Sequence, residues 1–287
     1  MKKKSKILII GGTRYVGLKL FKDLKKNKFL KIYTLSRSRF HHKNHISCDR
    51  NNYNKLRILI KKINPQIIID MINFSEKNSK DIKNLFEKDE MPSLKHYIVI
   101  SSFFVYNFFD LKKFREKKLI SNKKIIIPEK YTRNKIKMEK ILYSSKIFDI
   151  TTIIRFPFIF SYDDYTGRFQ KICEVSKNSK NRNFKGKKFS MISKHFAVKC
   201  LKHLIYSKPK KIIDLSNKGY VDINKIVKTI NGNLNYKIKF KKNFLTKNIP
   251  YFINRQLCIK TKKINFQENL IYALKKESKL YFIKNNK

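Results

Sequence analysis

The chain has 287 residues, 41% of them hydrophobic, and carries a formal net charge of +49 at pH 7. Its length and apolar content suffice for a sizeable buried core, which excludes a disordered polyelectrolyte. Nucleic-acid-binding proteins gather basic charge on one face, whereas lysines are spread along this whole sequence, so we interpret most of them as solvated surface residues.

Short apolar runs alternate with amphipathic segments along the chain. Runs rich in Ile and Val predict strands that are buried on both faces, as in a parallel sheet covered by helices. The predicted strands are 6–10, 30–35, 66–70, 96–100, 151–155 and 211–215, and the clearest helical segments are 15–27, 53–63 and 131–145. This alternation predicts an α/β fold with a Rossmann-like, doubly wound parallel sheet.

The first strand runs into GGTRYVG, a glycine turn that precedes a helix. Glycines allow a tight turn, and the N-terminus of a helix attracts phosphate, so the segment is typical of a dinucleotide-binding loop. The outer glycines of the usual three are present, and Arg14 replaces the middle one. An ordinary strand–helix turn is the alternative. The predicted cofactor contacts are Gly11, Gly12, Thr13, Arg14, Tyr15, Val16 and Gly17.

The second predicted strand ends in YTLSRSRF. Ser36 and Arg37 stand where an enzyme that prefers NAD places an acidic residue for the ribose 2′-hydroxyl, so NADP(H) is the favoured cofactor. Arg14 could reach the same phosphate, or it could simply point to solvent. The nearby HHKNH cluster, residues 41–45, lacks further ligands at metal-binding spacing and predicts a solvated loop, so no metal site is expected.

A serine and a Tyr–Lys pair are the candidate catalytic residues. Ser102 follows the predicted strand 96–100. Ligands in such folds bind beyond the carboxyl ends of the strands, although Ser102 could merely cap a turn. Tyr131 and Lys135 are four residues apart on a predicted helix and so share a face. A free tyrosine has a pKa near ~10, and a lysine one turn away favours the phenolate. Taken alone, YxxxK also occurs by chance in a lysine-rich chain.

The alternation of predicted strands and helices becomes less regular after residue 160. A basic loop covers 176–188, and the remainder mixes helices with one predicted strand, 236–240. We therefore predict an NAD(P)-binding Rossmann domain over 1–160 and a smaller, mainly substrate-binding lobe over 161–287. The segment 195–215 is expected to return to the Rossmann sheet.

Neither the N-terminus nor the cysteines indicate export or a membrane. Four apolar residues precede the first glycine, which is too short for a secretory signal, and the most apolar window is too short to span a bilayer. The four cysteines form no CxxC pair, which fits a reducing compartment. The prediction is a cytoplasmic protein without membrane association.

The glycine loop, strand-end serine and YxxxK helix occur in the order found in extended short-chain dehydrogenase/reductases, and the chain resembles this NAD-dependent epimerase/dehydratase family. Segments 98–106 and 151–164 are similar to the family's VYG and LRP…GP regions. The GGTR form and the CDR sequence at 48–50 resemble a divergent branch that includes chloroplast stem-loop RNA-binding proteins. The sequence departs from the family's usual residues at Arg14, Asn107, Ser161, Tyr162 and His195.

The resemblance implies roles for individual residues. Ser102 would polarise the reacting oxygen, and Tyr131 would be the general acid/base. Lys135 would lower the pKa of Tyr131 and hold the nicotinamide ribose. Asp49 would lie near the adenine, and Pro157 would also contact the cofactor.

The leading hypothesis is an NAD(P)-dependent epimerase, dehydratase or reductase that moves a hydride at a C–OH carbon. Its substrate would be a nucleotide-sugar or another anionic small molecule, with Arg155 and Arg168 as candidate phosphate contacts. Two alternatives stay open: an RNA-binding protein on the same scaffold, and an NADP-binding regulator without turnover. Weak, non-specific RNA binding and a homodimer are compatible with the leading hypothesis.

Overall fold

The computed structural model describes residues 4–108, 129–177, 190–232 and 267–285. The chain divides into two compact units, each built from three segments of the sequence. Unit 1 comprises Met1–Val105, Lys130–Arg155 and Val198–Ile213, and unit 2 comprises Tyr106–Glu129, Phe156–Ala197 and Asp214–Lys287. The chain therefore leaves the first unit three times and returns to it twice.

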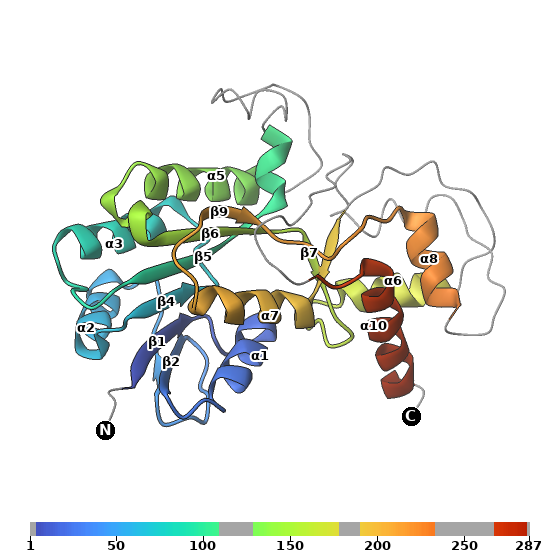
Figure 1. Cartoon of the computed structure of the whole chain (residues 1–287), viewed down its shortest axis with the longest axis horizontal. Coiled ribbons are helices and arrows are strands. Elements are labelled where there is room, and N and C mark those ends of the chain that lie inside the picture. Colours follow the sequence, from blue (N-terminus) through green and yellow to red (C-terminus); the bar gives the residue numbers. More distant parts are fainter. Residues whose placement is uncertain (1–3, 109–128, 178–189, 233–266, 286–287) are drawn as a thin grey trace. The chain divides into compact units, whose positions relative to one another are not determined.

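A seven-stranded sheet forms the centre of unit 1 (Figure 1). Its strands are β1 Ser5–Ile10, β2 Leu30–Ser36, β3 His45–Ser47, β4 Ile67–Asp70, β5 His96–Ser102, β6 Thr151–Phe156 and β9 Lys211–Asp214. They lie in the order β3-β2-β1-β4-β5-β6-β9, and the pairs from β3 through β5 are parallel. The predicted α/β Rossmann-like sheet is confirmed. The strand order reverses between β1 and β4, which is where such sheets bind ligands.

Helices cover both faces of this sheet (Figure 1). They are α1 Tyr15–Leu24, α2 Tyr53–Ile63, α3 Glu76–Glu87, α5 Glu129–Tyr143 and α7 Lys194–Ile205, and two 3₁₀ turns, η1 Phe103–Phe108 and η2 Lys146–Ile150, follow β5 and α5. Apolar residues of α2, α3 and α5 share one core with the strands. Helix α1 lies with α7 on the opposite face, where Asp23 pairs with Lys202.

Local sequence explains where two of these helices begin. The side chain of Asn52 accepts a hydrogen bond from the Lys55 backbone N–H at the start of α2. Ser75 does the same for the Asn78 N–H at the start of α3. Such caps satisfy backbone donors that have no partner within the helix.

Unit 2 has a small core of its own. It contains β7 Phe158–Phe160, β8 Met191–Ser193, α6 Arg168–Lys177, α8 Ile223–Asn231 and α10 Leu270–Asn285. The two strands pair in parallel, and apolar residues of the three helices pack against them. The predicted strand 236–240 and most of the predicted basic loop 176–188 lie outside the described residues.

The structure corrects the prediction for the histidine cluster. Instead of lying in a solvated loop, His45 is in β3, and its ring bonds to Thr34 Oγ1 at 3.0 Å and to the carbonyl of Ser38 at 2.9 Å. The ring of His42 packs edge-on against Phe21 of α1. A three-residue strand is too short to show a hydrophobic alternation, so the sequence did not predict it. No described His, Cys, Asp or Glu side chains group in threes that could hold a metal.

Among the described helices, none is long and apolar enough to cross a membrane.

A buried histidine predicts acid sensitivity of unit 1. His96 Nε2 bonds to Thr152 Oγ1 at 2.8 Å, and that oxygen also accepts from the Lys210 N–H at 2.8 Å. His96 Nδ1 is buried without a partner among the described residues. Burial lowers the pKa of His96 to about 4. The folded protein therefore binds the proton less tightly than the unfolded chain, whose histidines titrate near ~6.5.

We expect His96 to cost about 3 kcal/mol of stability as pH falls from about 6.5 to about 4, with no cost above that window. Urea unfolding of wild type and His96→Gln at several pH values measures the effect, since other titrating groups cancel in the difference. The stability of His96→Gln should fall less steeply over this window. The exposed His41, changed to Gln, is the control. Parallel pH curves for wild type and His96→Gln would contradict the expectation.

Candidate functional site

The glycine loop after β1 has the backbone geometry that its sequence predicts. Gly11 has φ of +85°, which strongly favours glycine. A Cβ on Gly17 would lie 2.4 Å from the carbonyl oxygen of Gly11, so no side chain fits where α1 packs against the turn. These two glycines therefore provide a tight turn and close helix packing, which are typical of dinucleotide-binding loops.

Arg14 and Tyr15 form the entrance to α1. Arg14 is extended and exposed, and it stands at the N-cap without a side-chain bond to the helix. Its Nη2 lies 3.4 Å from Ser38 Oγ, in the loop after β2. Tyr15 has φ of +46°, a region that residues other than glycine rarely occupy and that is enriched at binding sites. The guanidinium of Arg14 thus extends toward the loop that follows Ser36 and contains Arg37.

The other predicted cofactor contacts lie at different positions along the sheet. Ser36 ends β2, is largely buried and donates to the Ser38 carbonyl at 3.1 Å, whereas Arg37 is exposed. Asp49 is exposed, and one of its carboxylate oxygens accepts from the Asn51 N–H at 2.8 Å. Pro157 is buried between β6 and β7.

Ser102 and Tyr131 both lie at the end of unit 1 where β5 ends and α5 begins. Ser102 is the last residue of β5, and its Oγ accepts from the Phe104 N–H at 3.2 Å, so it caps η1. Tyr131 is in the first turn of α5 and is half-buried. Its ring lies between those of Phe74 and Phe104, with centroids 6.4 and 6.3 Å away.

Lys135 is 1% exposed, and its ammonium points into the end of the sheet. It donates to the backbone carbonyl of Asn73 at 2.7 Å and to that of Ile100 at 2.6 Å. Asn73 follows β4, and Ile100 lies in β5. Its Nζ is 5.8 Å from the centre of the Tyr131 ring. Burial lowers the pKa of Lys135 to about 7. The predicted Tyr–Lys pair is thus adjacent in space, and its lysine titrates within the range of physiological pH.

Arg155 lies in a buried ion pair. It is 2% exposed, and it donates to the carboxylate of Glu139 through Nε at 3.0 Å and Nη2 at 2.5 Å. Ser101 Oγ donates to the same carboxylate at 2.5 Å. A guanidinium that is buried and already neutralised is poorly placed to bind a substrate phosphate. The ion pair with Glu139 therefore supports a structural role for Arg155 better than the predicted substrate contact.

Arg168 lies in unit 2, at the start of α6. Its Nε donates to Thr166 Oγ1 at 2.7 Å and lies 3.5 Å from Asp164 Oδ2, and its guanidinium covers the ring of Phe158. Its side chain remains 38% exposed. The guanidinium therefore keeps surface through which it could bind an anion.

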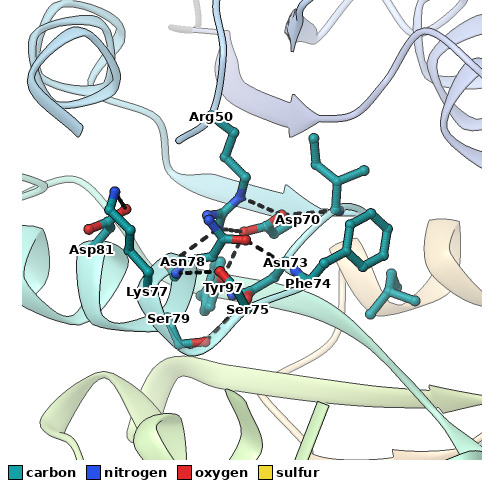
Figure 2. A network of polar contacts seen from close by, with 12 residues as sticks. Arg50, Asp70, Asn73, Phe74, Ser75, Lys77, Asn78, Ser79, Asp81 and Tyr97 are labelled. Carbon is teal, nitrogen blue, oxygen red and sulfur yellow. Dashed lines mark hydrogen bonds and ion pairs between the residues drawn. The ribbon is translucent and has the colours of Figure 1, made fainter. Parts of the chain in front are cut away.

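A buried polar network that the sequence did not predict includes Asn73, whose carbonyl accepts from Lys135 (Figure 2). Asp70, at the end of β4, accepts from Arg50 and from the hydroxyl of Tyr97. Asn73 donates to Tyr97 Oη at 3.1 Å. All four side chains are at most 3% exposed. The sequence offered one signal for this network, which is the carboxylate of Asp70 at the end of the apolar run IIID. An unpaired charge is unfavourable in a buried strand, so this carboxylate indicates a buried partner.

The strand order and glycine loop define a Rossmann-type fold, and it is the fold of NAD-dependent epimerases and dehydratases. No protein-family model and no curated protein matches the sequence. dTDP-glucose 4,6-dehydratase from Bacillus anthracis, solved in complex with NAD, superposes with a TM-score of 0.73 at 12% identity, over 98% of this chain and 97% of the other.

Two further solved structures share the fold over similar lengths. UDP-glucose 4-epimerase from Thermotoga maritima gives a TM-score of 0.66 at 14% identity, over 98% of this chain and 100% of the other. dTDP-4-dehydrorhamnose reductase from Bacillus anthracis, in complex with NADP, gives 0.65 at 15% identity, over 99% of both chains. The fold expected from the family resemblance is confirmed.

Proposed function

We propose that the protein is an NAD(P)-dependent epimerase, dehydratase or reductase that acts at a C–OH carbon of a nucleotide-sugar or another anionic small molecule. The observation that carries the proposal is the buried Lys135, one helical turn from Tyr131, at the carboxyl end of a Rossmann sheet. Three solved structures with this fold are named as a dehydratase, an epimerase and a reductase of nucleotide-linked sugars, and two of the three contain NAD or NADP.

The residues divide the chemistry between them. The glycine loop and the N-terminus of α1 would bind the dinucleotide, with Asp49 near the adenine and Pro157 also in contact with the cofactor. A bound dinucleotide would accept or supply the hydride. Tyr131 Oη would take or return the hydroxyl proton, with Ser102 Oγ holding the same substrate oxygen. The Lys135 ammonium would favour the phenolate of Tyr131 through its charge. Arg168 is the remaining candidate contact for a substrate phosphate.

Native mass spectrometry of the purified protein tests this proposal first. We expect a bound NADP(H) or NAD(H) and, with added nucleotide-sugars, a ternary complex. The same spectra report whether the chain is a homodimer. Co-purifying RNA that survives physiological salt would favour the RNA-binding alternative, because contacts made through counterion release weaken strongly as salt rises.

The cofactor is proposed to be NADP(H), since Arg14 approaches the loop after β2, Arg37 lies in that loop, and residues 36–40 include no acidic side chain that would repel a 2′-phosphate. A charged hydrogen bond contributes about 1.5–3 kcal/mol, so Arg14→Ala or Arg37→Ala should each weaken NADPH binding roughly 10- to 150-fold. NADH binding should change much less. Fluorescence titration of both dinucleotides measures the selectivity.

Lys22→Ala, which removes an exposed cation farther along α1, is the matched control for net charge. It should leave both affinities unchanged. Preference of the wild type for NADH, or an equal loss for both dinucleotides in the arginine variants, would contradict the assignment.

A further inference from the structure

The position of the Lys135 ammonium depends on a backbone carbonyl. Its bonds within unit 1 are to the carbonyls of Asn73 and Ile100, rather than to a carboxylate. Ile100 is held by the pairing of the sheet, because it lies within β5. Asn73 lies beyond the end of β4, so hydrogen bonds in the sheet do not hold it. Whatever holds Asn73 therefore also places Lys135.

Both ends of the Asn73 side-chain amide are bonded. Its Nδ2 donates to Tyr97 Oη at 3.1 Å, and its Oδ1 accepts from Ser79 Oγ of α3 at 3.2 Å. Asn73 and Ser79 are both 0% exposed, so water does not replace these bonds. An amide held at both ends in a dry site leaves its own backbone little freedom.

Tyr97 joins this amide to a buried ion pair. Its hydroxyl donates to Asp70 Oδ2 at 2.9 Å while it accepts from Asn73. Burial raises the pKa of Tyr97, so the hydroxyl keeps its proton and stays a donor. Asp70 is in turn paired with Arg50, which also lies 3.4 Å from the carbonyl of Asn78 in α3 (Figure 2).

We propose that Tyr97 and Asp70 are positioning residues for Lys135. The Arg50-paired carboxylate of Asp70 holds the Tyr97 hydroxyl, the hydroxyl holds Asn73, and the Asn73 carbonyl holds the ammonium. The catalytic relevance of this chain of contacts rests on the proposed function, because it matters for turnover only if Lys135 serves Tyr131 and the dinucleotide.

Charge acts through the same residues. The carboxylates of Asp70 and Glu139 both favour the ammonium form of Lys135, and the guanidinium of Arg50 opposes it. Arg155 neutralises Glu139, and the Tyr131 ring contributes its π face. The coupling between Lys135 and the network should therefore be strongest when Lys135 is charged, below its pKa of about 7.

A double-mutant cycle between Tyr97→Phe and Lys135→Met tests the proposal without any dinucleotide. At pH 6 we expect Tyr97→Phe to reduce the folding equilibrium constant about fivefold more in wild type than in the Lys135→Met background, the size of one hydrogen bond. The coupling should shrink at pH 9, where the lysine is neutral. Urea unfolding of the four proteins measures it. Additive effects, or a coupling that does not change with pH, would overturn the proposal, since packing alone is insensitive to the charge of Lys135.

Two further variants serve as a control and as a substitute for Tyr97→Phe. Thr152→Val removes a buried hydroxyl that bonds to His96, the neighbour of Tyr97 in β5, and its effect should add to that of Lys135→Met. Ser79→Ala releases the other end of the Asn73 amide and should couple to Lys135 as Tyr97→Phe does, so it replaces Tyr97→Phe if that variant does not fold.

The NADPH affinity of each variant separates the inference from the proposed function. Wild type that fails to bind dinucleotide while the coupling is present refutes the proposed function only. The positioning role alone is refuted by a different result. In that case wild type binds NADPH, Tyr97→Phe changes the affinity as little as Thr152→Val does, and the stability effects of Tyr97→Phe and Lys135→Met are additive. We expect Tyr97→Phe to weaken NADPH binding about fivefold and Thr152→Val to leave it unchanged.

Discussion

Tyr131→Phe is expected to lower turnover by ~10²–10⁴-fold, the usual contribution of a general acid/base, while dinucleotide affinity stays within a few-fold. The substitution removes one hydroxyl from a ring whose packing against Phe74 and Phe104 remains. Lys135 keeps its two carbonyl partners, because neither involves the phenol. The loss should therefore fall on proton transfer and not on folding or cofactor binding.

The measurement is formation of product from a panel of nucleotide-sugars, followed by NMR or mass spectrometry, because an epimerase or dehydratase returns its dinucleotide to the starting redox state. Tyr143→Phe is the matched control, since Tyr143 lies on the same helix and is exposed. It should leave turnover unchanged. Full activity of Tyr131→Phe on a substrate that the wild type converts would show that another group transfers the proton.

Arg155→Leu is expected to lower the free energy of unfolding by about 3–5 kcal/mol, because it leaves the carboxylate of Glu139 buried without its counter-charge. Ser101 Oγ would remain as a hydrogen-bond donor to that carboxylate, but a neutral hydroxyl does not compensate a buried charge. Glu139 is on α5 and Arg155 on β6, so the loss should loosen the helix that contains Tyr131 and Lys135.

Urea unfolding tests this expectation with two comparisons. The double variant Glu139→Gln/Arg155→Leu removes both charges and should recover part of the loss. Lys211→Ala breaks the exposed pair with Asp149, whose distance of 2.6 Å is similar, and should change stability little. An equally small effect for Arg155→Leu would mean that the buried pair does not stabilise the packing of α5.

The local features of the fold could be predicted from the sequence. The strands β1, β2, β4, β5, β6 and β9 were predicted because each is an apolar run bounded by polar or turn-forming residues. The Gly11–Gly17 turn follows from adjacent residues, since a positive φ and close helix packing both select glycine. The adjacency of Tyr131 and Lys135 follows from helical periodicity alone.

Only the tertiary structure decided which charged residues face the site. Arg155 was predicted to bind a substrate phosphate, but its partner Glu139 comes from another element and is paired with it only by the packing of α5 on β6. The network of Arg50, Asp70 and Tyr97 likewise joins residues from three separate segments of the chain. Sequence periodicity reports which side of an element is buried, but it does not report which buried partner compensates a charge. That choice depends on contacts between elements distant in sequence, which here pair Arg155 with Glu139 and bring the Asn73 carbonyl to the Lys135 ammonium.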